Sequence, residues 1–558
     1  MGGDSGGRLH AFRSLAANGA LVRILAAYAL FVLTECTAWI AMLVFAYSRG
    51  GATAAGFVAV AQLVPAAVLA PVIAAIADRR SPVVVLAAGY LVQAAGMAAA
   101  AAAIFAGVPI AAYGSAVIYC VAQTATRPAQ SVLVPSVAAT ADQLTAVNVV
   151  VSWLESAGVV ASGLLAGILI SLAGVGSVFV VCAGLGVAAV LLAVALRAES
   201  IAPPQEGPAA VLAGVAEGLR LAARRPRLRV MLALLTAEAV VAGALDLLFV
   251  ILAIGVLGRS EAWVGYLNSS YGVGAVLAAT VSAILVGRRL GAPILGAALL
   301  LSAVLVVLGF GIGLAGTVAL LAVAGAACTM LDVALRTLLQ RSVPPQLMGR
   351  VFGVLEGFTM AGYALGALLV PLLVHLGGNR LALIGAAVVL PLAAAAGGRA
   401  LFALDAGVPV PVVEIALLRS LPLFAELPAP TIEGLAAALT LVHVPAGTAL
   451  IRQGEPGDAY YAIAAGELDA VQDGQLLRRC GRGEGVGEIA LLRSVPRTAS
   501  VIAYTAATVY RLNRDPFLTA VLGHAATQRL ADRIADTRLA TGAAPGSSDA
   551  GETTAEPG

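Results

Sequence analysis

Long apolar runs, each about the length of a helix that crosses a membrane, make up most of the chain. Such a helix needs roughly 20 predominantly apolar residues. Runs of this length recur between residues 21 and 404, and short polar or Gly/Pro-rich stretches separate them. The runs predict twelve transmembrane helices, at residues 21–47, 53–77, 83–106, 109–135, 146–171, 175–197, 228–257, 263–287, 291–313, 316–341, 351–376 and 381–404.

The longest connection between these runs, residues 198–227, divides the predicted helices into two sets of six. Its segment VLAGVAEGLRLAARRPRLR places apolar residues at helical spacing opposite arginines, which predicts an amphipathic helix at the membrane surface. We therefore expect an N-terminal segment at 1–20, a first membrane half at 21–197, this linker at 198–227 and a second half at 228–404.

The placement of arginines predicts the orientation of the chain, because short loops rich in positive charge stay on the cytoplasmic side. The arginines that fall in even-numbered connections are Arg79, Arg80, Arg224, Arg225, Arg227, Arg229, Arg288, Arg289, Arg341 and Arg350. Odd-numbered connections hold few. Both termini are therefore expected in the cytoplasm, with the protein in the lipid bilayer of the cell membrane.

The sequence pattern changes after residue 404. A short Pro-containing stretch at 405–416 is expected to be a linker, and residues 417–540 show short alternating apolar runs with glycine turns, which are typical of strands in a separate soluble domain. Residues 541–558 are rich in Gly, Ser, Pro and acidic residues, so we expect a disordered tail there.

Composition supports this division and excludes other classes. The chain is 60% hydrophobic and 11% charged, with a mean hydropathy of +0.97, which lies outside the range of soluble globular proteins. A net charge of +3 is too small for nucleic-acid binding, so no nucleic-acid partner is expected. The five cysteines have no metal-ligand spacing, and no metal site is predicted.

One segment of the soluble part has the chemistry of an anion site. Residues 487–501 read GEIALLRSVPRTASV, where a short helix beginning near Gly487 would present free backbone N–H groups and the positive end of its dipole. Arg497 follows closely, and its planar guanidinium suits a phosphate group. The segment therefore predicts a site for a small phosphate-containing ligand.

This segment resembles the phosphate-binding cassette of the cyclic nucleotide-binding domain family, and the resemblance extends over about 120 residues of the soluble part. It implies a β-roll with flanking helices, and cAMP or cGMP as a regulatory ligand, with no other cofactor. By the family's pattern Glu488 would accept the ribose 2′-hydroxyl and Arg497 would pair with the phosphate. The base would be covered from the last helix, between Leu530 and Ile534. The other cassette residues implied in binding are Gly487, Ile489 and Ala490, whose backbone would line the sugar and phosphate, and Thr498, whose hydroxyl would reach the phosphate or a guanine amino group.

The membrane part resembles the major facilitator superfamily, which implies an all-α fold of two six-helix halves. Asp78, Arg79 and Arg80 stand at the acidic-basic core of that superfamily's cytoplasmic loop signature, whose role is in conformational change. Ala74 replaces the expected glycine of this signature, and its second basic pair is missing. The segment LLQRSVPPQLMGRVFG at 338–353 is similar to exporters related to siderophore and macrolide efflux proteins.

Charged residues inside the predicted helices are candidates for transport chemistry, because a charge in hydrocarbon is costly unless it faces a cavity or a partner. They are Glu35, Arg127, Glu155, Glu238, Asp246, Asp332, Arg336 and Glu356. In the superfamily, helices 1, 4, 7 and 10 line the cavity, which implies roles in transport or proton coupling for Glu35, Arg127, Asp246 and Asp332. Alternatively, Asp332 and Arg336 simply pair with each other, one helical turn apart.

Together these features predict a monomeric secondary active transporter, an ion-coupled exporter of a small amphiphilic compound that cytoplasmic cyclic nucleotide regulates. A membrane-anchored nucleotide sensor or scaffold without transport is the alternative. A nucleotide-gated ion channel would need a carbonyl-lined filter motif such as TVGYG, which the sequence lacks. The GxxxxGK[ST] motif of ATP hydrolysis is also missing from the sequence, and no enzyme activity is predicted.

Overall fold

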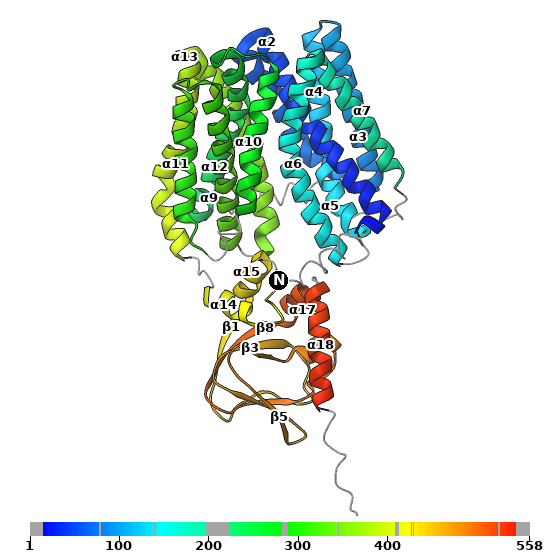
Figure 1. Ribbon diagram of the computed structural model, residues 1–558, viewed down its shortest axis with the longest axis vertical. Coiled ribbons are helices and arrows are strands. Elements are labelled where there is room, and N and C mark those ends of the chain that lie inside the picture. The colour runs from blue at the N-terminus through cyan, green and yellow to red at the C-terminus, as the bar shows by residue number, and fades with distance from the viewer. Residues whose placement is uncertain are drawn as a thin grey trace, which may run out of the picture. The chain divides into compact units, whose positions relative to one another are not determined.

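The computed structural model describes residues 15–77, 80–137, 141–196, 220, 224–281, 288–343, 345–407, 412–425, 427, 429–522 and 525–542 (Figure 1). The chain divides into two compact units, one formed within His10–Pro409 and the other containing Val410–Gly558. Each is described separately below.

The first unit is helical throughout its described residues (Figure 1). Its first half contains α2 (Gly19–Ala77), α3 (Pro82–Phe105), α4 (Pro109–Gln123), α5 (Thr126–Val137), α6 (Ala141–Ala173) and α7 (Val175–Val194). Its second half contains α9 (Pro226–Val250), the π-helix η1 (Ile251–Val256), α10 (Ala262–Val281), α11 (Gly291–Leu308), α12 (Gly313–Ser342) and α13 (Pro345–Gly407).

Glycine pairs break the two longest helices. The backbone of α2 leaves helical geometry at Gly50 and Gly51, and that of α13 leaves it at Gly377 and Gly378. The second glycine of each pair has a φ of +61° or +73°, a left-handed value that side chains with a Cβ rarely adopt. Each long helix therefore consists of two apolar helices that meet at a sharp bend.

Eight helices among the described residues are long and apolar enough to cross a membrane, and two of them, Gly19–Ala70 and Val351–Ala406, contain the glycine breaks. Large apolar side chains such as those of Phe105, Leu172 and Leu191 are exposed along these helices. In water such a surface would be unfavourable, whereas lipid tails cover it without cost. The mostly helical, multi-pass character predicted from the apolar runs is thus confirmed.

One predicted helix differs in the structure. The run at 109–135 forms two helices, α4 and α5, which are separated at Thr124 and Ala125. Pro128 lies in the first turn of α5 and has no N–H group to donate to the preceding turn. The apolar run therefore continues through the break, although the helical hydrogen bonds do not.

The two halves of the first unit contact each other through α6 and α10. A Cβ atom at Gly163 on α6 would lie 2.6 Å from the carbonyl oxygen of Gly265 on α10. At the same contact, the Ser269 hydroxyl of α10 donates to the carbonyl oxygen of Val160 on α6 at 2.8 Å. Small residues allow this approach, as is common between membrane helices.

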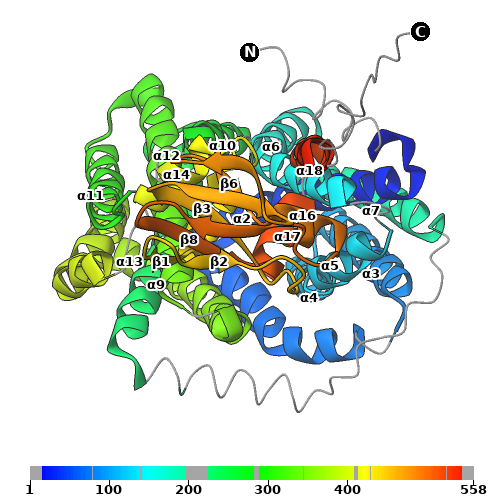
Figure 2. The same cartoon turned by 90° about the horizontal axis from the view of Figure 1, so that it is seen from below.

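In its described residues, the second unit contains two four-stranded antiparallel sheets and five helices (Figure 2). One sheet has the order β1-β8-β3-β6 and the other β2-β7-β4-β5. The strands are β1 (Thr440–Val444), β2 (Ala449–Ile451), β3 (Ala459–Ala465), β4 (Leu468–Gln472), β5 (Gln475–Cys480), β6 (Gly485–Val486), β7 (Ser500–Ala503) and β8 (Ala507–Asn513). The helices are α14 (Val412–Ser420), α15 (Ala429–Ala438), α16 (Glu488–Arg493), α17 (Arg514–Leu522) and α18 (Ala525–Gly542).

Two apolar clusters hold the second unit together. Alternating residues of the strands, including Ile463, Leu468 and Val509, are buried between the sheets. Phe424 and Phe517 pack around Tyr460 at the base of the helices, with ring centroids 5.0–6.0 Å apart. The predicted domain of strands with flanking helices is therefore present.

The α6–α10 contact gives a test of the packing of the first unit. Gly163→Leu should destabilise it by about 1–3 kcal/mol, because the added side chain meets the backbone of α10. Gly184→Leu is the matched control, since a Cβ at Gly184 on α7 meets no atom within 4 Å. Thermal unfolding in detergent should show a lower Tm for the first variant alone, and equal Tm values would contradict this packing.

Candidate functional site

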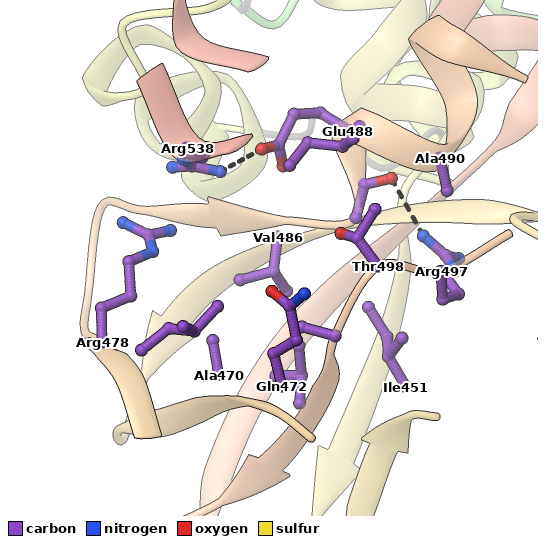
Figure 3. A pocket seen from close by; sticks show the side chains of 15 residues that line it. Ile451, Ala470, Gln472, Arg478, Val486, Glu488, Ala490, Arg497, Thr498 and Arg538 are labelled. Atoms are coloured by element: carbon purple, nitrogen blue, oxygen red, sulfur yellow. Dashed lines mark hydrogen bonds and ion pairs between the residues drawn. The ribbon is translucent and has the colours of Figure 1, made fainter. Parts of the chain in front are cut away.

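A cavity of about 350 Å³ opens in the second unit beside α16 (Figure 3). It is lined by Ile451, Ala470, Gln472, Leu477, Arg478, Val486, Gly487, Glu488, Ile489, Ala490, Arg497, Thr498, Ala499, Val501 and Arg538. All six cassette residues predicted from the sequence are among them. Apolar walls with a few charged groups at one end are typical of a small-molecule site.

Gly487 begins the cassette, and only glycine fits at this position. Its φ is +96°, and it directly precedes α16. A Cβ atom there would lie 2.5 Å from Nη1 of Arg497 and 3.1 Å from the carbonyl oxygen of Ala459. The backbone can therefore turn tightly beneath the arginine, so that α16 starts at the wall of the cavity.

Arg497 is fixed in place by acceptors on its far side. Its Nη1 donates to the carbonyl oxygen of Gly487 at 2.9 Å, and its Nη2 donates to that of Ala459 at 2.7 Å. Nη2 also contacts Asp458 Oδ1 at 3.1 Å, and the same carboxylate accepts from Arg511 at 2.8 Å. The Arg497 side chain is only 4% exposed. Because one exposed carboxylate serves two arginines, a buried positive charge remains at the cavity.

Glu488 has one carboxylate oxygen in use and one without a partner. Arg538 on α18 donates from Nη1 to Glu488 Oε1, and also to the carbonyl oxygen of Gly485 at 3.0 Å. Oε2 of Glu488 is buried and accepts no hydrogen bond from the described residues. A buried acceptor without a donor is costly, so this oxygen is suited to a hydroxyl group brought by a ligand.

Arg538 is a site residue that the sequence reasoning missed. The predicted cover for the base was the segment 530–534, but none of its residues lines the cavity, whereas Arg538, further along α18, does. Ion pairs between α16 and α18 hold this helix beside the cavity. Arg493 Nη2 lies 2.5 Å from Asp536 Oδ1, and Arg493 Nη1 lies 3.6 Å from Asp532 Oδ1. In the sequence, the arginines and acidic residues of α18 are the feature from which Arg538 could have been identified.

Two titratable groups near the cavity contribute packing rather than charge. Burial raises the pKa of the Tyr460 hydroxyl well above its ordinary value, and it also raises the pKa of the Cys480 thiol. Both groups therefore stay neutral at physiological pH. Cys480 is fully buried and packs as a small apolar residue.

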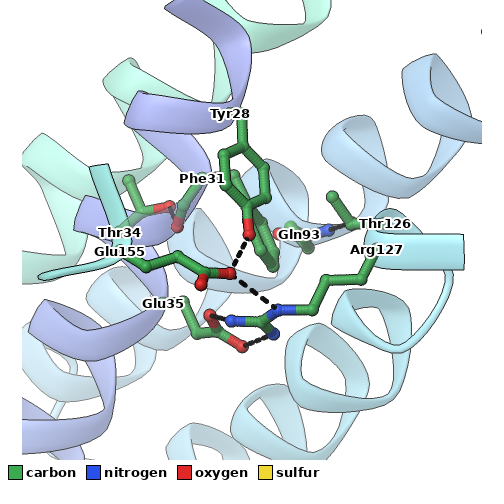
Figure 4. A network of polar contacts seen from close by, with 8 residues as sticks. All are labelled: Tyr28, Phe31, Thr34, Glu35, Gln93, Thr126, Arg127 and Glu155. Carbon is green, nitrogen blue, oxygen red and sulfur yellow. Dashed lines mark hydrogen bonds and ion pairs between the residues drawn. The ribbon is translucent and has the colours of Figure 1, made fainter. Parts of the chain in front are cut away.

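In the first unit, α2, α5 and α6 bring a group of polar residues together (Figure 4). Arg127 donates to both carboxylate oxygens of Glu35, at 3.0 and 2.9 Å. Its Nε lies 4.0 Å from Glu155 Oε1, and the Tyr28 hydroxyl donates to that oxygen at 2.5 Å. Glu35 and Arg127 were predicted site residues, whereas Glu155 was noted only as a charge inside a helix and Tyr28 was missed.

The other predicted residues of the first unit have separate partners. Asp246 on α9 accepts a hydrogen bond of 3.0 Å from Trp39 Nε1 on α2, so this contact joins the two halves. Asp332 contacts Arg336 Nε at 2.6 Å, which is the local pair proposed as the alternative to a transport role. Within the described residues, neither carboxylate forms a hydrogen bond or ion pair with Glu35 or Arg127.

The predicted loop motif lies mostly outside the described residues. Asp78 and Arg79 lie outside the described residues, and Arg80 is exposed. Within the described part of the chain, no three His, Cys, Asp or Glu side chains are grouped so as to hold a metal ion.

Comparison with known families agrees with both resemblances. Residues 24–293 match the Major Facilitator Superfamily, and residues 441–524 match the Cyclic nucleotide-binding domain. The first match lies within the first unit and the second match within the second unit.

Individual relatives match only a small part of the chain. The cAMP-dependent protein kinase regulatory subunit of Aspergillus niger is 39% identical over 104 residues, which cover 18% of this chain and 25% of that protein. An uncharacterized protein of Mycobacterium tuberculosis is 38% identical over 98 residues, 18% of this chain and 19% of its own length. The chain spans about a quarter of the length of the kinase subunits it matches. Among solved structures, the regulatory domain of Toxoplasma gondii PKA with cAMP is 30% identical, covers 21% of this chain and 46% of that chain, and has a TM-score of 0.20.

Proposed function

We propose that this chain, which carries a Major Facilitator Superfamily region and a cyclic nucleotide-binding domain, is a secondary active transporter that cytoplasmic cyclic nucleotide regulates. The observation that carries the regulatory part is the cavity beside α16. There a buried Arg497 and an unpartnered oxygen of Glu488 line the same cavity. A cyclic nucleotide has a singly charged phosphate and a ribose hydroxyl on one ring system, which these two groups complement.

The chemical groups of the ligand predict its orientation in the cavity. The phosphate would lie against Arg497 and the first turn of α16, and the ribose 2′-hydroxyl would donate to Glu488 Oε2. The related kinase subunits are named for cAMP, so cAMP is the first candidate. cGMP is the second, because Thr498 lines the cavity and its hydroxyl would accept from a guanine amino group.

The transport part depends on the first unit. The two glycine-broken helices, together with the other helices of this unit, are consistent with twelve crossings in two halves of six. We assign both termini to the cytoplasm on the arginine pattern. The sequence lacks the GxxxxGK[ST] motif of ATP hydrolysis, so the energy for transport would come from an ion gradient. The substrate class that we assign, from the resemblance of residues 338–353, is an exported small amphiphile.

The phosphate role of Arg497 is directly testable in the full-length protein. Arg497→Ala should weaken cAMP binding at least 100-fold, about 2.7 kcal/mol, because a charge-assisted contact in a buried site is lost. Binding of a fluorescent cAMP analogue to protein in detergent measures this. Arg511→Ala removes the other arginine on Asp458 without entering the cavity, and should bind within a few-fold of the wild type. Unchanged affinity of the Arg497 variant would refute the assignment.

The ribose role of Glu488 needs a ligand change as well as a side-chain change. The wild type should bind cAMP about 10- to 100-fold more tightly than 2′-deoxy-cAMP, since the deoxy ligand leaves Oε2 without a donor. Glu488→Ala should remove most of this preference. Arg538→Ala is the matched control, because it removes the partner of Oε1 and leaves Oε2 in place, so it should keep more of the preference than Glu488→Ala does. Equal preferences in the wild type and Glu488→Ala would place the ribose elsewhere.

Regulated transport separates the proposal from the sensor or scaffold alternative. Proteoliposomes with internal pyranine report proton movement, and ethidium and Hoechst 33342 serve as amphiphilic probes. The flux of at least one probe should be coupled to proton movement and should change when cAMP is added, because a nucleotide that favours one conformation shifts its population. Arg497→Ala should transport without responding to cAMP. Wild-type protein that binds cAMP but moves neither probe nor protons would favour the scaffold.

A further inference from the structure

Glu238 on α9 is a buried carboxyl group that has no cationic partner. It is 8% exposed, and its only hydrogen bond in the described structure comes from the thiol of Cys328 on α12, whose Sγ lies 3.3 Å from Oε1. No ion pair within 4.0 Å involves Glu238 among the described residues. A thiol is a weak donor, so it compensates little of the cost of a buried negative charge.

Glu238 lies where α9 and α13 pack closely together. On the neighbouring turn of α13, a Cβ atom at Gly362 would lie 2.7 Å from the Cβ of Ala239 and 2.9 Å from the carbonyl oxygen of Thr236. The backbones of α9 and α13 therefore touch beside the carboxyl group. An isolated ionised carboxylate in such a place is so unfavourable that the group takes up a proton instead.

The charged and titratable groups around Glu238 support the same reading. Arg336 lies two turns beyond Cys328 on α12, but its Nε is engaged by Asp332 at 2.6 Å. Glu238 and Asp332 thus have one arginine near them, and Asp332, on the same helix as Arg336, is the acid that pairs with it. The groups that interact electrostatically with Glu238 from the elements around it are Cys328, Asp332 and Arg336 on α12, Tyr271 on α10 and Tyr363 on α13.

The first half of the unit shows the opposite arrangement. There Glu35 and Glu155 also share one arginine, but Arg127 reaches both, and the Tyr28 hydroxyl donates to Glu155. The side chains of Arg127 and Glu155 are 52% and 48% exposed, so the surplus acid of that group is not enclosed by protein. The surplus acid of the second half, Glu238, is enclosed.

We propose that Glu238 is a proton-binding site of the membrane unit. It holds a proton in the conformation described, and it releases the proton in a conformation that brings water or the Arg336 guanidinium to its carboxyl group. In the release step the O–H bond breaks and the proton passes to water. Binding of the proton is independent of the proposed function, whereas a role for its release in ion coupling rests on it.

Infrared spectroscopy of the full-length protein in lipid nanodiscs tests proton binding directly. The wild type should show a protonated carboxyl C=O band at neutral pH that decreases as the pH rises. Glu238→Gln should lack this band. Asp246→Asn is the matched control, because it removes another, partly buried acid of α9 and should keep the Glu238 band. A Glu238→Gln spectrum identical to that of the wild type would overturn the proposal, and so would a Glu238 band that never changes with pH.

Cys328 gives a second readout that leaves Glu238 in place. Its S–H stretch lies in a clear part of the spectrum and is identified by its loss in Cys328→Ala. In the wild type this stretch should move to lower frequency as Glu238 loses its proton, since the thiol then donates to a charged acceptor. Cys328→Ala should also shift the Glu238 C=O band. A thiol band that is independent of pH would contradict the proposal even if Glu238→Gln failed to fold.

These measurements need no substrate. If the protein transports nothing, both bands are still observed, and only the coupling role fails. If transport occurs and the bands do not depend on Glu238, the proton site is wrong and the proposed function stands.

Discussion

The cost of removing a charge from water governs where every functional residue of this protein lies. Across the first unit, long apolar helices leave few places for ionised side chains, and Glu35, Asp246 and Asp332 each have a partner from another turn or another helix. In the second unit, the same cost explains why Arg497 is surrounded by carbonyl oxygens and a carboxylate. A buried guanidinium without these acceptors would not remain at the cavity wall. Without the guanidinium, the cavity would not favour an anion.

This constraint also separates what the sequence predicts from what it does not. The apolar runs predict the helices well, because their length and hydropathy are properties of consecutive residues. The cassette is equally local: Gly487 to Thr498 form one turn, one short helix and the segment after it, so their spacing in the chain carries their geometry. The break between α4 and α5 could be read from Pro128, but the apolar run hides it.

Sequence patterns do not predict which residues on different helices are partners. Trp39 and Asp246 are 207 residues apart, and Arg538 reaches Glu488 across 50 residues. A single sequence gives no register between such helices, so it identifies the charged residues without telling which of them pair. For this reason Asp246 and Glu238 look alike in sequence, whereas in the structure an indole N–H group of the other half partners one and only a thiol partners the other.

The two oxygens of Glu488 show how occupancy of the cavity can act on the rest of the domain. Arg538 uses Oε1, and a ribose hydroxyl would use Oε2, so the ligand need not displace α18 to bind. Each contact instead fixes the carboxylate in the orientation that the other requires. Ligand binding and docking of α18 then favour each other, and because such coupling is reciprocal, whatever restrains α18 changes nucleotide affinity by the same factor. Under the proposed function, the output of the domain would lie at its last helix, since a nucleotide that bound equally well with α18 docked or released would shift nothing.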